Sequence, residues 1–357
     1  MHGHRIARTL AALTLALLLG LTAALEIHFV DVGQGDGVLL VLPDGRGVVY
    51  DAGNDDGAML RYLRDAGITH LALVIASHPH ADHIGGLAAV IDAYAPPFVL
   101  DNGLTHTTRT FERYLDAVER SGAQLLEPTE RTLTLGDVRL HVLPSPLRPE
   151  WGHNDNSIGI IVEYESFRAS LTGDAEARLF EWWLATAPDT FAAVHVHKAS
   201  HHGSANGDTP EALARLRPEI VVVSAGAGNR YGHPDGTIVA SYEEAGARVF
   251  RSDHHGSVIV TVAPDGTYDV ASEHDRSPVL VLDDDRREPS SSSDAHCVDI
   301  NSASTDLLEV IIHIGPDRAP ELVERRPFHD IDDLRRISGI GPARLSDIHA
   351  QGLACTQ

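Results

Sequence analysis

Three histidines and one aspartate lie within six residues, in the stretch Ser77-His78-Pro79-His80-Ala81-Asp82-His83. His78 and His80 are two positions apart, so an extended backbone directs both rings to the same side. Asp82 and His83 follow and can face a neighbouring point. Imidazole together with carboxylate suits Zn, Mn, Fe or Ni better than Ca or Mg. The spacing therefore predicts two adjacent divalent cations, while a solvated histidine-rich turn is the alternative.

The elements that must position this cluster are apolar runs that end in polar residues. Leu71–Ala76 leads into the cluster, which predicts a buried strand that breaks into a loop at one edge of a sheet. Asp51 ends the run that begins at Gly47, and we expect its carboxylate to hydrogen-bond a ligand histidine and fix its tautomer. Asp174 ends another run and can bridge two cations.

Two more histidines follow a third apolar run, and a further one lies on a polar loop. His201 and His202 are adjacent, and either can complete the second cation site; we favour His201. His153 is expected to complete the first site, with Asn156 or water as the alternative. The predicted metal ligands are therefore His78, His80, Asp82, His83, His153, Asp174 and His201.

Candidates for contacting a substrate lie nearby in the sequence. His233 occupies a glycine-flanked loop, and Lys198 is the only lysine of the chain. We expect His202, His233 and Lys198 to contact a substrate phosphate or to protonate a leaving oxygen, and Asp82 to act with them as a catalytic metal ligand. A surface position is the alternative for Lys198.

The order of predicted elements suggests an α/β fold in which two sheets pack face to face with helices outside. Arg5 and Arg8 precede an uncharged apolar run, which predicts a signal peptide over residues 1–25, or else an N-terminal anchor. We expect a hydrolase domain over residues 26–273 and a polar linker over 274–295. A small all-α domain is predicted over 296–357.

Composition limits the ways in which this chain can bind its partners. The net charge is −23, which opposes loose electrostatic attachment to nucleic acid or anionic membranes. A polyanionic substrate must therefore be held by metal, by local arginine or by backbone amides. Cys297 and Cys355 lie near the two ends of the predicted C-terminal domain, and in an exported chain such a pair favours a disulfide.

Several of these motifs together resemble a known family. Asp51-Ala52-Gly53, the His78-x-His80-x-Asp82-His83 signature and Thr172-Gly173-Asp174 resemble the metallo-β-lactamase superfamily. The stretches Phe29–Asp36, Asn154–Ser157, Lys198–Ser204 and Asn229–Pro234 are similar to the hydrolase domain of the competence protein ComEC. The resemblance covers about Glu26 to Ser272 and implies an αββα sandwich whose bound metal cuts one strand of incoming DNA. The ComEC membrane channel is not found in this sequence, so transport itself is not implied.

A second resemblance lies beyond the linker. The sequence Ile-Gly-Pro occurs at Ile314 and again at Ile340, which is similar to the tandem helix-hairpin-helix domain of the DNA receptor ComEA. A glycine-rich hairpin leaves backbone amides free to bind phosphate without reading sequence. His313 replaces the usual first glycine, so the first hairpin is expected to bind more weakly. The predicted DNA-binding residues are Ile314, Gly315, Arg318, Gly339, Ile340, Gly341 and Arg344.

These expectations combine into an exported phosphodiesterase that uses two divalent metal ions, Zn or Mn, to cut DNA. The helix-hairpin-helix motifs would tether it to DNA, and a competence-type uptake machinery is the expected partner. A hydrolase of a small ester, lactone or β-lactam is the main alternative, although such a substrate needs no DNA tether. A non-catalytic DNA receptor is a third hypothesis, which the nearly complete ligand set disfavours. A helical protein-docking role is the alternative for the C-terminal domain.

Overall fold

The computed structural model describes residues 24–274, 279–281, 298–303, 305–308, 311–315, 318–351 and 354–356. They belong to two compact units with a boundary between Asp283 and Asp284, and each unit is described by itself. Almost all of the predicted signal or anchor segment, and most of the predicted linker, lie outside the described residues. Among the helices of the described residues, none has the length and apolar character needed to cross a membrane.

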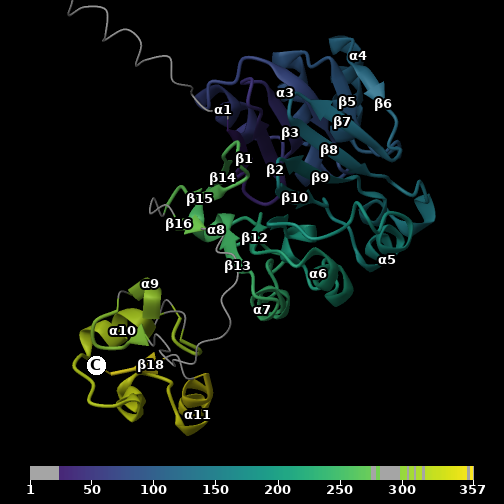
Figure 1. Ribbon diagram of the computed structural model, residues 1–357. Coiled ribbons are helices and arrows are strands. Elements are labelled where there is room, and N and C mark those ends of the chain that lie inside the picture. The colour runs from purple at the N-terminus through teal and green to yellow at the C-terminus, as the bar shows by residue number, and fades with distance from the viewer. Residues whose placement is uncertain are drawn as a thin grey trace, which may run out of the picture. The chain divides into compact units, whose positions relative to one another are not determined.

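The first unit contains two β-sheets (Figure 1). One sheet has the strand order β16-β15-β14-β1-β2-β3-β4-β5-β6, and the other has the order β13-β12-β11-β10-β9-β8-β7. The strands of the first sheet are β1 Leu25–Phe29, β2 Gly37–Val41, β3 Gly47–Ala52, β4 Leu71–Ile75, β5 Phe98–Leu100, β6 Gln124–Leu126, β14 Val258–Val262, β15 Tyr268–Ser272 and β16 Val279–Val281. Those of the second are β7 Arg131–Leu135, β8 Val138–Leu143, β9 Gly159–Tyr164, β10 Phe167–Leu171, β11 Val196–Lys198, β12 Ile220–Val223 and β13 Arg248–Arg251.

The main core lies between the two sheets. Ile27 and Tyr50 from the first sheet pack in one buried cluster with Leu140 and Val222 from the second. Side chains alternate along each strand, so Val48 faces this cluster while Val49 joins a different one under the outer helices. Because both faces of the central strands are covered, their sequences are almost continuously apolar.

Helices cover the outer face of each sheet. The first sheet packs against α1 Ala58–Asp65, α3 Leu87–Tyr94 and α4 Arg109–Ser121. The second packs against α5 Ala177–Thr186, α6 Pro210–Leu216 and α7 Gly236–Glu244. Shorter helices in the connections are α2 Ala81–Ile84, α8 Ser252–His255, η1 Pro149–Trp151, η2 Asn154–Asn156 and η3 Ser200–Gly203. The layer order is helix, sheet, sheet, helix, which confirms the predicted αββα sandwich.

Parallel strands set the position of the predicted site. In the first sheet β3, β4 and β5 are parallel neighbours, and in the second β10, β11, β12 and β13 are parallel neighbours. The carboxyl ends of parallel strands meet at the same edge of a sheet, where ligands of such folds bind. The connections after β4, β10 and β11 carry the predicted metal ligands except His153, which lies between β8 and β9.

The second unit is small and mostly helical. It contains α9 Thr305–Leu308, α10 Arg318–Glu324, η4 Ile331–Arg336 and α11 Pro342–Gln351 around its own apolar core. The short strands β17 Val298–Asp299 and β18 Ala354–Cys355 pair in parallel. The prediction of a purely helical unit is therefore corrected. Cys355 is disulfide-bonded, and Cys297, its expected partner, lies outside the described residues.

Candidate metal centre

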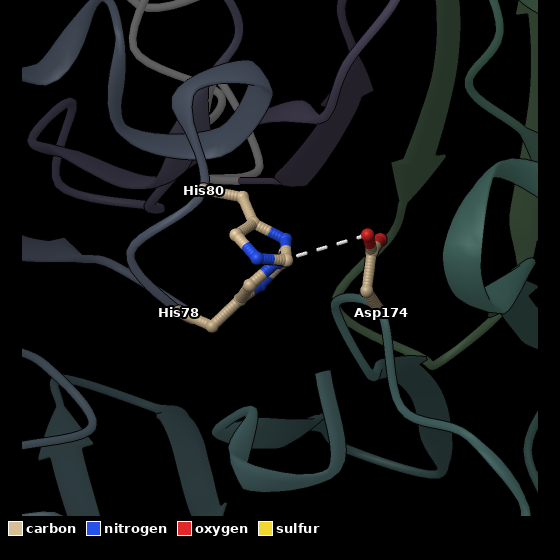
Figure 2. A group of neighbouring side chains, drawn as sticks. All are labelled: His78, His80 and Asp174. Atoms are coloured by element: carbon tan, nitrogen blue, oxygen red, sulfur yellow. Dashed lines mark hydrogen bonds and ion pairs between the residues drawn. The ribbon is translucent and has the colours of Figure 1, made fainter. Parts of the chain in front are cut away.

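The first group of ligand atoms joins the loop after β4 to the loop after β10. Nε2 of His78 and Nδ1 of His80 are 3.0 Å apart, and His78 Nε2 is 3.7 Å from Oδ2 of Asp174 (Figure 2). The three side chains offer ligand atoms within 4.8 Å of one another. Burial, reinforced by the neighbouring ring of His83, lowers the pKa of His78 well below its usual value. The ring is therefore neutral, which is the form that binds metal.

The second group consists of Asp82, His83 and His202, whose ligand atoms also lie within 4.8 Å of one another. Asp82 and His83 lie on α2, directly after the first two histidines. His202 Nε2 is 3.4 Å from Oδ2 of Asp82. The predicted cluster thus separates into two groups, as its spacing indicated.

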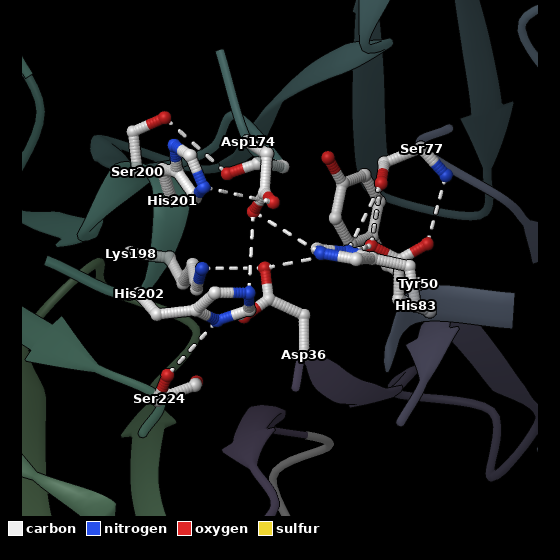
Figure 3. A network of polar contacts seen from close by, with 12 residues as sticks. Asp36, Tyr50, Ser77, His83, Asp174, Lys198, Ser200, His201, His202 and Ser224 are labelled. Atoms are coloured by element: carbon white, nitrogen blue, oxygen red, sulfur yellow. Dashed lines mark hydrogen bonds and ion pairs between the residues drawn. The ribbon is translucent and has the colours of Figure 1, made fainter. Parts of the chain in front are cut away.

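Asp174 faces both groups. Figure 3 shows it beside His83 and His202 of the second group. Its Oδ2 atom faces His78 Nε2, whereas its Oδ1 atom is 3.1 Å from Nε2 of His83 and 3.5 Å from Nε2 of His202. The two oxygens of one buried carboxylate are therefore directed at different ligand groups. This is the geometry that a bridging aspartate requires.

Three atoms of this site test whether a cation fits. His83 Nε2 and His202 Nε2 lie 3.1 Å and 3.5 Å from Asp174 Oδ1, and apart from such charge pairing within the site these three buried atoms have no hydrogen-bond partner. Buried charged groups are costly unless they are paired or bind a metal, so three such atoms converging on one point require an explanation. A divalent cation at that point would satisfy all three. The imidazole and carboxylate donors match the preferences of Zn, Mn and related metals.

The charges of the site give the same indication. Burial alone would raise the pKa of Asp174, but the rings of His83 and His202 hold it well below its usual value. Burial likewise opposes a charged His202, but Asp174 and Asp36 raise its pKa to about 9. The buried carboxylates thus require positive charge beside them, which protons supply in the absence of metal.

Asp51 and Ser77 hold His83 from the side opposite Asp174. His83 Nδ1 donates to Oδ2 of Asp51 over 2.8 Å, and this carboxylate also accepts from Ser77 N over 2.8 Å and Ser77 Oγ over 2.6 Å. Asp51 thereby holds a proton on Nδ1, so Nε2 is the nitrogen that faces Asp174 and that can give up its proton to become a metal ligand. Asp51 thus makes the contact that its place at the end of a strand suggested.

Nδ1 of His202 faces two acceptors, the carbonyl of Ser224 at 3.1 Å and the carboxylate of Asp36, and Asp36 was missed as a site residue. Its Oδ1 atom is 3.0 Å from Nδ1 of His202, and its backbone N–H donates to the carbonyl of Asp82 over 3.0 Å. Asp36 directly precedes β2, so an acidic residue beside a strand was again the available signal.

Lys198 does not lie where the sequence suggested. Its side chain is fully buried at the end of β11 and forms an ion pair with Asp36. It neutralises a carboxylate beneath the site and cannot reach a substrate phosphate. The predicted phosphate contact is therefore wrong. The sequence could not indicate this pairing, because Asp36 lies 162 positions away from Lys198.

The choice between His201 and His202 is resolved by the backbone. His201, His202 and Gly203 have φ values of 49°, 56° and 73°, so the chain turns left-handed over three residues. This turn brings His202 into the second ligand group. His201 instead lies with Nε2 at 3.7 Å from Asp174 and Nδ1 at 3.3 Å from Glu176, so the preference for His201 is corrected.

His153 lies beside the first group and not within it. Its ring centroid is 5.4 Å from that of His80 and 4.7 Å from that of His106, a residue that the sequence did not single out. Asn156 is excluded as its substitute, because its amide binds the backbone of Arg148 and Gly152.

His233 lies on the open side of the second group. Its ring centroid is 5.8 Å from that of His201 and 6.4 Å from that of His202. Its side chain is half-buried, and burial followed by the charge of His202 lowers its pKa. The structure thus places His233 beside the second group, and its contact with a substrate stays a prediction.

In the C-terminal unit, several predicted DNA-binding side chains are structural. Ile314 and Ile340 are buried in its core, so only their backbone can face a ligand. Arg318 donates to the carbonyl of Ser338 over 2.9 Å, and Arg344 donates to the carbonyl of Gly339 over 3.0 Å. Both arginines therefore brace the hairpins in this structure.

Comparisons with known proteins agree with this geometry. Residues 30–226 match the metallo-β-lactamase superfamily, and residues 293–351 match the helix-hairpin-helix motif. The chain is 27% identical over 277 residues to ComE operon protein 3 of Bacillus subtilis (strain 168), which covers 71% of this chain and 35% of that protein. It is 27% identical over 221 residues to Recombination protein 2 of Haemophilus influenzae, with 58% and 25% covered.

A shorter stretch of 64 residues is 42% identical to a protein named Deoxyribonuclease from Thioalkalivibrio sp. (strain K90mix) and covers 18% of each chain. The chain thus spans about a third or less of the length of these relatives. The competence-protein resemblance drawn from the motifs is confirmed by these matches. Because the first family match covers more than half of the residues, this chain belongs to the metallo-β-lactamase superfamily.

Proposed function

We propose that this chain is an exported phosphodiesterase that uses two divalent metal ions, Zn or Mn, to cleave DNA without sequence preference. The observation that carries the proposal is Asp174, whose two buried oxygens face two separate ligand groups. The printed names of two relatives, Recombination protein 2 and Deoxyribonuclease, favour DNA as the substrate.

The reaction depends on how the protein holds its ligands. When bound, two divalent cations supply a nucleophile from water near neutral pH and offset the charge of a phosphodiester. Asp51 orients His83 and Asp36 orients His202, so each Nε2 atom is fixed before metal arrives. Asp82 completes the second group as a metal ligand, and we assign it a role in catalysis as well. We assign His153 to the rim of the first group, where its neutral ring can join the ligands.

The substrate reaches this centre from the side of His233. Its half-buried ring is the predicted contact for a phosphate oxygen or for the leaving group. The protein as a whole is acidic, so bound cations must offset its repulsion of a polyanion.

We assign DNA tethering to the two hairpins of the C-terminal unit. A Cβ atom added at Gly315 or Gly341 would meet no atom within 4 Å, so space is open in front of both hairpins. Backbone amides in such hairpins bind phosphate without a strongly basic surface. Arg318, Arg344 and Gly339 hold the hairpins in shape. A tether of this kind raises the local concentration of DNA at the hydrolase unit.

The proposed place of action is outside the cytoplasm, next to a competence-type DNA uptake machinery. This rests on the predicted signal or anchor of residues 1–25 and on the similarity to ComE operon protein 3. Fusion of residues 1–40 to a reporter enzyme that is active only after export tests it, and a silent reporter would contradict export.

A digestion assay tests the activity. Purified full-length protein is stripped with chelator, reloaded with Mn²⁺ or Zn²⁺, and incubated with labelled single-stranded and double-stranded DNA. We expect cleavage with added metal, and loss of cleavage in Asp82→Ala. Intact DNA with every metal, together with hydrolysis of chromogenic esters or lactams, would identify the enzyme as a small-molecule hydrolase instead.

A further inference from the structure

Three aromatic rings lead from the metal ligands to the protein surface. The ring of His233 stacks 6.4 Å from His202 at an interplanar angle of 27°, and Tyr231 stacks 5.9 Å from His233 at 13°. His202 is 2% exposed, whereas Tyr231 is 53% exposed. The series therefore begins at a ligand candidate and ends in an aromatic ring that is half exposed to solvent.

A pocket of about 480 Å³ lies beside this exposed ring. Gln34, Asn54, Asp82, Arg230 and Tyr231 are among the residues that line it. Asp82 belongs to the second ligand group, so the pocket opens directly next to the metal centre. Its volume is sufficient for one base with part of its sugar.

Arg230 gives this pocket a positive charge in an acidic protein. Its guanidinium lies 5.0 Å from the ring centroid of Tyr231 and donates to the hydroxyl of that residue over 2.9 Å. Both side chains are exposed, so the guanidinium can move aside from the ring it covers and leave that face to a base, while it stays close enough to bind a phosphate. Phosphate and nucleobase are the two halves of a nucleotide that such a pair can recognise.

The loop that carries this pair is held in one shape. Asn229 Oδ1 accepts from the backbone of Tyr231 and of His233, each over 3.1 Å, and Asn229 Nδ2 donates to the carbonyls of Gly226 and His233. The N–H of Gly226 in turn donates to Gln34 Oε1 over 3.1 Å. A preorganised loop loses little freedom when it binds, which favours a recognition role.

We propose that this pocket holds the nucleotide next to the scissile phosphate, with an unpaired base stacked on Tyr231 and its phosphate beside Arg230. The inference rests on the proposed DNA cleavage and adds a substrate class to it. A base inside a duplex has both faces covered by its neighbours, so only a splayed base can stack on Tyr231. Single-stranded DNA is therefore the preferred substrate, with little dependence on base identity.

The test compares two single-stranded oligonucleotides with metal-loaded full-length protein. One has normal bases, and the other has abasic sugars around the cleaved phosphate. Stacking of one base is worth about 1–3 kcal/mol, so KM should be roughly 5- to 150-fold lower for the oligonucleotide with bases. We expect Tyr231→Ala to abolish this difference and Tyr231→Phe to retain it. Arg230→Ala should raise KM for both oligonucleotides.

Matched controls use similar groups away from the pocket. Phe98 is exposed at the start of β5, and Arg248 has its guanidinium 4.6 Å from the ring of Phe250. Phe98→Ala and Arg248→Ala should keep the difference between the two oligonucleotides. If the wild-type protein cleaves DNA but shows the same KM with and without bases, or if Tyr231→Ala keeps the difference, the nucleotide pocket is wrong and the nuclease proposal stands. If the wild type cleaves neither oligonucleotide with any metal, the nuclease proposal itself fails.

Discussion

Two carboxylates shape the metal centre without being among its closest ligands. Asp51 accepts from Nδ1 of His83, and Asp36 faces Nδ1 of His202, so both histidines present Nε2 to Asp174. At His83 the carboxylate of Asp51 holds the proton on Nδ1, and at His202 the carbonyl of Ser224 does so together with Asp36. Metal affinity should therefore depend on residues that do not reach the metal.

Asp51→Asn tests this dependence. An amide can present its NH₂ group to His83 Nδ1, which would favour the tautomer with the proton on Nε2 and block the ligand atom. We expect metal affinity to fall roughly 10- to 100-fold, measured by competition with a chromophoric chelator. Asp44→Asn, at an exposed turn where Asp44 accepts from Arg46, is the control and should bind metal normally. Equal affinity in both variants would contradict the role of Asp51.

The same residues predict how the metal-free protein responds to pH. Burial opposes charging of His202, but Asp174 and Asp36 raise its pKa from 6.5 to about 9, and Asp174 and Asp51 raise that of His83 in the same direction. A raised pKa in the folded state stabilises the fold below the unfolded value, and this contribution is lost as pH rises through the folded value.

We therefore expect the free energy of unfolding of the metal-free protein to fall between pH 6.5 and about 9. Urea titrations in the presence of chelator measure this dependence. Saturation with Mn²⁺ should flatten it, because the cation replaces the protons. A metal-free protein whose stability rises over this range would contradict the assignment.

At the residue scale, the sequence was sufficient to predict the types of metal ligand, but not which side chains contact one another in the fold. The spacing of His78, His80, Asp82 and His83 was sufficient to predict two ligand groups. Whether His201 or His202 joins them depends on a left-handed turn over two successive histidines, a conformation that is uncommon for any residue other than glycine. The burial of Lys198 depends on Asp36, which lies far away in the chain. Local patterns cannot contain such information.

At the scale of elements, the end of β10 is the most constrained part of the site. Gly173 has a φ of 56°, and a Cβ atom there would lie 2.8 Å from Cβ and 2.9 Å from Oγ of Ser77. Ser77 is the residue that donates to Asp51. The close approach of these two loops therefore connects the bridging aspartate to the support of His83.

Gly173→Ala should disturb both loops at once. We expect destabilisation of about 1–2 kcal/mol from the left-handed backbone and about 1–3 kcal/mol more from crowding against Ser77. Metal content, measured by elemental analysis, should also fall. Gly136→Ala is the matched control, since Gly136 has a φ of 66° but open space around it. If the two variants lose equal stability and both retain metal, the close packing has no role.

Apolar patterns of the sequence indicate some elements of the fold and not others. They predict helices over Ala58–Asp65, Leu87–Tyr94 and Pro210–Leu216, and the structure has these bounds. They do not indicate strands β5 and β6, because three residues are too few to show a period. The sequence His254-His255-Gly256-Ser257 predicts a solvated turn, but Ser252–His255 forms the short helix α8.

At the scale of the whole molecule, the family assignment confirms the predicted fold class and the predicted enzyme class, a metal-dependent hydrolase. The motifs were sufficient for this because each kept its spacing along the chain. The two units have separate cores, so the proposed DNA binding and the proposed DNA cleavage can be perturbed independently.

Removal of residues 296–357 should separate the two activities. We expect KM for long DNA to rise on the order of 100-fold through loss of the tether, while kcat for a short oligonucleotide stays within about twofold. Gly341→Asp tests the same point in the full chain, because it places a negative charge in the open space before the second hairpin. Unchanged KM in both variants would exclude tethering by this unit.

The burial of Lys198 also determines how this protein responds to chemical labelling. The sequence has no second lysine, and the side-chain amine of Lys198 is enclosed with Asp36 in the folded first unit. Acylating reagents and lysine-directed proteases therefore have no accessible lysine on the native surface. Modification at this position requires the sheet to open, so its rate would serve as an intrinsic reporter of unfolding.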